Sequence, residues 1–158
     1  MGMKKRTLIA VAGLVLAGSL LNTGQVKAQD GGYWRAASTT ASSITGDISI
    51  AETKLMINFT TFPLGQIRKL SPTEVSAVFD ADVSAGINGT LYRLSVPAEK
   101  RFLHHNTLCG TETTQWMVTY ATGRTLQVAF FSGDETPVFT FDAISNSTRL
   151  CGTYTYAR

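Results

Sequence analysis

Two adjacent histidines and a pair of aspartates are the side chains in this sequence best suited to chemistry. His104 and His105 are its only histidines, and Asp80 and Asp82 would share one face of a strand. An imidazole beside a carboxylate can act as a general acid or base, and three converging groups can bind a metal ion. On a strand the histidines would point to opposite faces, whereas in a loop they could converge with Asp80 or Asp82. We expect the alternative, a solvated loop and solvent-facing aspartates, and therefore neither metal nor cofactor.

Motifs of nucleophilic catalysis give no further support to an enzyme. The sequence has no Gly-x-Ser-x-Gly elbow and no glycine-rich phosphate loop before a helix. A small enzyme that uses the histidines with the aspartates therefore stays an alternative, and we expect a non-catalytic protein.

Cys109 and Cys151 are the only cysteines, and each lies in a Leu-Cys-Gly-Thr segment. An even number of cysteines in an oxidising compartment indicates a disulfide, and two cysteines allow one intramolecular pairing. Closing a loop of about 42 residues would stabilise the fold by ~4 kcal/mol in the chain-entropy model. A reactive or metal-binding thiol is the alternative, which the lack of a Cys-x-x-Cys pair disfavours.

The compartment is indicated by residues 1–28, which have the three parts of a secretory signal peptide. Basic residues 4–6 precede an apolar run over residues 7–21, and a Val-Lys-Ala cleavage site ends at Ala28. The run is shorter than the roughly 20 apolar residues of a membrane span, so we expect no stable span after cleavage. The sequence thus predicts one mature domain, residues 29–158, in the periplasm or medium of a bacterium.

Removal of the leader changes the charge of the chain. The whole sequence carries 14 basic and 11 acidic residues. Four of the basic residues lie in the leader, which leaves ten against 11 in the mature domain. Without an excess of cations to neutralise phosphates, we expect no nucleic-acid partner.

The mature domain is rich in β-forming residues, with turn residues at short intervals. Leu55, Ile57 and Phe59 alternate on one face of an expected strand, and Asn88-Gly89 predicts a tight turn. The expected strands cover residues 33–38, 44–50, 54–60, 90–96, 114–120, 125–131, 138–141 and 153–156, with residues 101–103 continuing the sheet and residues 62–65 breaking it. Residues 71–74 have the form of a capping box, although residues 75–79 also alternate as a strand would. The pattern predicts a mainly β protein of about eight strands, an antiparallel barrel or a sandwich, with at most short helical turns.

Aromatic side chains concentrate in the C-terminal half of the sequence. Five of them fall on expected inward faces, and Phe131 lies on the opposite side of its strand from Phe130; the five are Trp116, Tyr120, Phe130, Tyr154 and Tyr156. An aromatic-lined barrel mouth could bind a small apolar ligand, whereas the alternative is that these rings fill the core. Phe131, if exposed, would indicate a surface for a partner.

Two resemblances extend this interpretation. Gly32-Tyr33-Trp34 resembles the Gly-x-Trp signature of lipocalin-type barrels, which implies that the tryptophan closes one barrel end under an arginine from the last strand. Arg149 and Arg158 are the arginines beside that strand. The segments GTLYR at 89–93, NTLCG at 106–110 and LCGTYTY at 150–156 are similar to small exported bacterial proteins. This second resemblance implies the disulfide and carries no activity.

These patterns predict an exported binding or interaction module whose ligand is a small apolar molecule or a protein. One alternative is an inhibitor of a hydrolase, with a flexible N-terminal segment at residues 29–32 that enters a protease cleft. The other is the small enzyme that uses His104 or His105 with Asp80 or Asp82.

Overall fold

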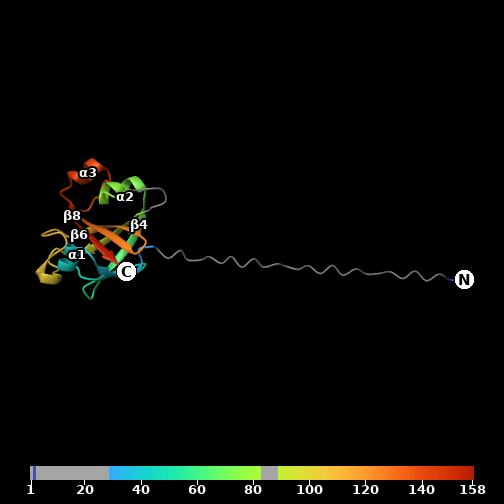
Figure 1. Cartoon of the computed structure of the whole chain (residues 1–158), viewed down its shortest axis with the longest axis horizontal. Coiled ribbons are helices and arrows are strands. Elements are labelled where there is room, and N and C mark those ends of the chain that lie inside the picture. Colours follow the sequence, from blue (N-terminus) through green and yellow to red (C-terminus); the bar gives the residue numbers. More distant parts are fainter. Residues whose placement is uncertain (1, 3–28, 83–88) are drawn as a thin grey trace.

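In the part of the chain that the structure describes, eight antiparallel strands form a closed barrel (Figure 1). The computed structural model describes Gly2 and residues 29–82 and 89–158, so the expected leader lies almost wholly outside the described residues. The strands are β1 (Gly32–Ala36), β2 (Ile48–Ile50), β3 (Lys54–Ile57), β4 (Thr60–Leu70), β5 (Gly89–Val96), β6 (Thr114–Thr122), β7 (Thr125–Ser132) and β8 (Leu150–Ala157). The helices are α1 (Thr39–Ile44), α2 (Pro72–Phe79) and α3 (Phe141–Ser145), with a 3-10 turn, η1 (Leu103–His105). Each strand pairs with its neighbours in sequence and β1 pairs with β8, which confirms the barrel.

The barrel interior is filled by apolar side chains from all eight strands. Its largest fully buried members include Trp34, Leu55, Ile57, Met117, Phe130, Tyr154 and Tyr156. Phe102, from the connection between β5 and β6, closes one end against Phe62, with the two ring centroids 6.1 Å apart. Alternation along each strand therefore places one row of side chains in a common core.

A second apolar cluster lies on the outer face of β5, β6 and β7. It contains Leu91 of β5, Val118 of β6 and Ala129 of β7, together with Val75 and Val78 of α2. Figure 1 shows α2 and α3 together on this side of the barrel, and α1 on another side beside the connection from β5 to β6. These three strands are therefore buried on both faces.

The expected capping box opens α2 and settles the undecided segment as a helix. The Ser71 hydroxyl accepts from the Glu74 N–H at 3.3 Å, and the Glu74 carboxylate accepts from the Ser71 N–H at 2.9 Å. Arg68 donates to both carboxylate oxygens, at 2.8 and 3.0 Å. These bonds are the main reason that the pKa of Glu74 is lowered to about 2.

Close approach of α2 to the sheet explains why β5 begins with a glycine. A Cβ atom at Gly89 would lie 2.8 Å from Cγ2 of Val75 and 2.9 Å from the carbonyl oxygen of Thr119. The preceding half of the predicted turn, Asn88, lies outside the described residues.

Capping by hydroxyl side chains starts a short helix at or beside two of the expected strands, so one of them is shortened and the other does not form. Residues 44–50 form a strand only in β2, because the Ser38 hydroxyl accepts from the Ala41 N–H and α1 runs through Ile44. The expectation of a strand over residues 138–141 is wrong, since the Thr140 hydroxyl caps α3 in the same way. Local side-chain bonds to the backbone compete with strand pairing at both places.

Two further expectations about the sheet are wrong. Residues 62–65 do not break the sheet, because β4 runs through them. Pro63, which cannot donate to a ladder, pairs with Lys54 at the last pair between β3 and β4. Residues 101–103 do not continue the sheet but lead into η1.

Candidate functional site

Three of the predicted aromatic residues line the barrel interior, as expected. The rings of Phe130 and Tyr154 meet edge to face with centroids 5.3 Å apart, and the Tyr156 hydroxyl lies 2.7 Å from Oγ1 of Thr45. Burial raises the pKa of Tyr154 to about 12 and also raises that of Tyr156. The three rings pack with Trp34 in one apolar cluster and fill the space that an interior ligand would need.

The inward orientation predicted for Trp116 and Tyr120 is wrong, because both belong to the outer cluster under the helices. In the ladder of β6 and β7, Trp116 pairs with Phe131, whereas the interior row pairs Met117 with Phe130. Phe131 does lie opposite Phe130, yet it is fully buried against Phe139 and offers no surface to a partner. The predicted aromatic set is thus divided between two cores.

The histidines and aspartates of the enzyme hypothesis lie toward opposite ends of β5. His104 and His105 are exposed in η1, which follows the end of β5. Asp80 ends α2 in a left-handed conformation, next to Phe79, whose ring stacks on Tyr120 at 6.0 Å near the start of β5. A strand of 8 residues spans about 25 Å, so the structure does not bring these groups together. Among the residues that the structure describes, no three His, Cys, Asp or Glu side chains form a possible metal site.

The base of the barrel, where the N-terminal segment meets β1, holds a buried carboxylate that sequence analysis missed. Asp30 is 3 % exposed. Its Oδ2 accepts hydrogen bonds from the hydroxyls of Tyr92 and Thr119, both at 2.6 Å, and its carbonyl accepts from the Trp34 indole at 2.8 Å. Burial, and next the bond to Asp30, raise the pKa of Tyr92, so its phenol stays protonated and donates. An aspartate followed by two glycines matches no motif that could have revealed this role.

Arg158 covers the same end of the barrel. Its guanidinium carbon lies 4.2 Å from the ring centroid of Trp34, and the group donates to the carbonyls of Gly31 at 3.0 Å and Gln29 at 3.3 Å. The lipocalin resemblance implies such a contact, which here uses Arg158 and not Arg149. Residues 29–31 are therefore hydrogen-bonded to the barrel, through the carbonyls of Gln29 and Gly31 and the buried side chain of Asp30.

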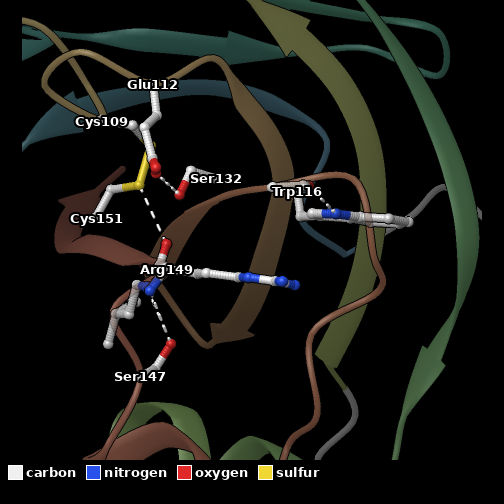
Figure 2. The surroundings of a disulfide bond; sticks show 9 residues. Cys109, Glu112, Trp116, Ser132, Ser147, Arg149 and Cys151 are labelled. Carbon is white, nitrogen blue, oxygen red and sulfur yellow. Dashed lines mark hydrogen bonds between the residues drawn. A yellow bond between two sulfur atoms is a disulfide. The ribbon is translucent and has the colours of Figure 1, made fainter.

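The disulfide joins the connection between β5 and β6 to the start of β8 (Figure 2). Cys109 and Cys151 have Cα atoms 4.9 Å apart, and the residues that the structure describes contain no free cysteine. Beside the disulfide, Ser132 of β7 donates a hydrogen bond to Glu112. The disulfide thus fixes the long connection between β5 and β6, which also contains His104 and His105.

Phe59 is the most exposed large apolar residue that the structure describes, at 94 %. It was expected to continue a strand with Leu55 and Ile57, but the pairing of Ile57 with Thr60 leaves Asn58 and Phe59 as a two-residue hairpin turn. Sequence analysis missed this turn because it contains no glycine. Tyr33, Met56, Ile67, Val138 and Phe141 are the other exposed large apolar residues.

Comparison with protein-family models, curated proteins and solved structures finds no match for this chain. Inference about function therefore depends on its own side chains. Among the described residues, no helix combines the length and apolar character needed to cross a membrane.

Proposed function

We propose that this protein is exported and works as a non-catalytic module that binds another protein through its outer surface. The observation that carries the proposal is the filled barrel interior. The rings of Trp34, Phe130, Tyr154 and Tyr156 occupy the space in which barrels of this size hold a small ligand. Binding is therefore more readily provided by the exposed side chains.

Export is supported by the basic and apolar leader in the sequence and by the joined cysteines, since disulfides persist in oxidising compartments. The proposed compartment is the bacterial periplasm or medium. N-terminal sequencing of the protein from the source cells tests this step. A chain that begins at Gln29 outside the cytoplasm is expected, and a full-length cytoplasmic chain would contradict export.

The alternatives receive less support. The separation of His104 from Asp80 along β5 disfavours the enzyme. The N-terminal segment that a hydrolase inhibitor would insert into its target is hydrogen-bonded to Arg158 and Tyr92 through Gln29, Asp30 and Gly31. An inhibitor that acts through another surface remains one case of the proposed protein-binding module.

Two titrations of the oxidised mature domain test the mode of binding. An apolar fluorescent probe, N-phenyl-1-naphthylamine, should show no saturable uptake, because the interior is occupied. A protein isolated with the domain from the exported fraction should bind it with a defined stoichiometry in calorimetry, and should not bind the reduced, carboxymethylated chain. Saturable probe uptake, or binding only by the reduced chain, would reject the proposal.

A further inference from the structure

Backbone strain is concentrated at one end of the barrel. The residues that the structure describes include five with positive φ that are not glycine, and four of them form two consecutive pairs. The pairs are Asn58 and Phe59, at 45° and 63°, and His104 and His105, at 52° and 62°. Because neighbouring strands are antiparallel, the connections from β3 to β4 and from β5 to β6 lie at the same end. We call these four residues the strained rim.

Phe59 has a backbone conformation that is unfavourable for a residue with a bulky side chain. A two-residue hairpin turn with positive φ at both positions favours Asn-Gly, and a bulky residue in this conformation is an outlier. The Phe59 ring is 94 % exposed, so it contributes almost no burial to offset the strain. Strained residues cluster at functional sites, and the fold itself gains nothing from this one.

The rim stands on a rigid support. On either side of the hairpin, Leu55 and Ile57 of β3 and Phe62 of β4 are buried in the interior cluster. Phe62 packs against Phe102, which directly precedes η1. The η1 segment is fixed further by a hydrogen bond from the Asn106 side chain to the Ser43 carbonyl at 3.1 Å, and by the disulfide at Cys109. Because this support holds the backbone beneath the ring, binding orders little more than the Phe59 side chain itself.

We propose that the strained rim is the contact surface of the module, and that it inserts the Phe59 ring into an apolar pocket of a partner protein. This inference rests on the proposed function. Protein interfaces commonly place an aromatic anchor at their centre and surround it with polar contacts that exclude water. Asn58 adjoins Phe59 in the hairpin turn, and the two imidazoles belong to a connection at the same end of the barrel. Adsorption to a membrane needs a broad apolar face or a cluster of cations, whereas the rim carries one large apolar side chain.

A photo-reactive side chain at the rim tests this inference in the full-length chain. The probe is p-benzoylphenylalanine, placed at position 59 and, as a matched control, at position 141. Phe141 is also an exposed phenylalanine, 67 % exposed, but it lies on α3 beside α2 (Figure 1). On irradiation of the source cells, we expect a covalent adduct with one second polypeptide from position 59 and none from position 141. An excess of the wild-type mature domain should abolish the adduct, and an excess of the Phe59→Ala domain should not.

The second measurement is the dissociation constant of the domain and its variants for the cross-linked protein, once that protein is purified. Phe59→Ala should weaken binding about thirtyfold, as loss of an aromatic anchor does, and Phe141→Ala should change it less than twofold. Phe59→Gly should also lose binding while the domain stays folded, which separates recognition from stability. A partner that cross-links from position 141 and not from position 59 would refute the strained rim as the contact surface, but would agree with the proposed protein-binding function. Adducts from neither position, with sedimentation of the domain on phosphatidylglycerol vesicles, would overturn both.

Discussion

Exchange of Phe59 for glycine and for alanine should reverse the usual order of stability of these two residues. At an ordinary exposed position, a variant with glycine has a free energy of unfolding about 0.5–1 kcal/mol lower than the variant with alanine, because glycine is more flexible in the unfolded chain. At Phe59 the backbone has a φ of 63°, which costs a residue with a Cβ roughly 1–2 kcal/mol and glycine almost nothing. The difference leaves Phe59→Gly more stable than Phe59→Ala by about 1 kcal/mol.

Exposure of the ring sets the position of the wild type in this order. Because the Phe59 side chain is 94 % exposed, its removal sacrifices about 0.3 kcal/mol of burial at most. Phe59→Ala should therefore match the wild type closely, and Phe59→Gly should exceed it. For a mature domain of about 130 residues, 1 kcal/mol corresponds to a rise in Tm of about 4 °C.

Differential scanning calorimetry of the oxidised domain measures these differences directly. Thr61 of β4 provides the control, since it is exposed, two residues away and outside the set with positive φ. Thr61→Gly should be less stable than Thr61→Ala by about 1 kcal/mol, which is the ordinary order. If glycine is also the less stable replacement at position 59, the hairpin is not strained and the argument for the rim loses its basis.

Three further predictions concern the interactions that hold the barrel together. Replacing Cys109 and Cys151 together by serine should lower the free energy of unfolding by ~4 kcal/mol, or Tm by about 15 °C, and an unchanged calorimetric transition would show that the loop closure is unimportant. Tyr92→Phe removes one of two hydroxyl donors to the Asp30 carboxylate and should reduce stability by about 2 kcal/mol in urea titration; a loss under about 0.5 kcal/mol would reject that role. Because the pKa of Glu74 is lowered from 4.5 to about 2, its contribution is complete above about pH 4.5 and disappears as the pH falls toward 2. Glu74→Gln should therefore cost about 1 kcal/mol at pH 7 and nothing near pH 2, whereas an equal loss at both pH values would contradict the ion pair.

The sequence predicts the sheet well where turn residues and alternation agree. The segments around β5, β6, β7 and β8 were expected within a few residues of their observed bounds. Alternation also separates Phe130 from Phe131 correctly. It cannot say which row faces inward on a strand that is apolar on both sides, and Trp116 was assigned to the wrong core for this reason. The choice of row depends on α2 and α3, which cover the outer row. The capping box at residues 71–74 indicates the start of α2, but no local pattern shows which strands this helix will cover.

Pairings between distant residues account for the rest of what sequence could not predict. The buried Asp30 depends on Tyr92 and Thr119, which are 62 and 89 residues away along the chain. No local periodicity encodes such contacts. The disulfide between Cys109 and Cys151 could be predicted, although the two residues are distant in sequence, only because two cysteines allow a single pairing.

The hairpin turn at Asn58 and Phe59 was not predicted from the sequence, and it is also the feature that suggests a binding surface. A turn of this kind normally contains glycine. Without one, the segment resembles a continuous strand with Phe59 on the same face as Leu55 and Ile57. The same absence forces a phenylalanine into the left-handed region, with its ring in solvent. The domain would be more stable with glycine at position 59, so the stability of the fold does not explain why phenylalanine is present. The proposed pocket on a partner protein would supply that reason, because burial of the ring there would offset the strain that the isolated domain carries.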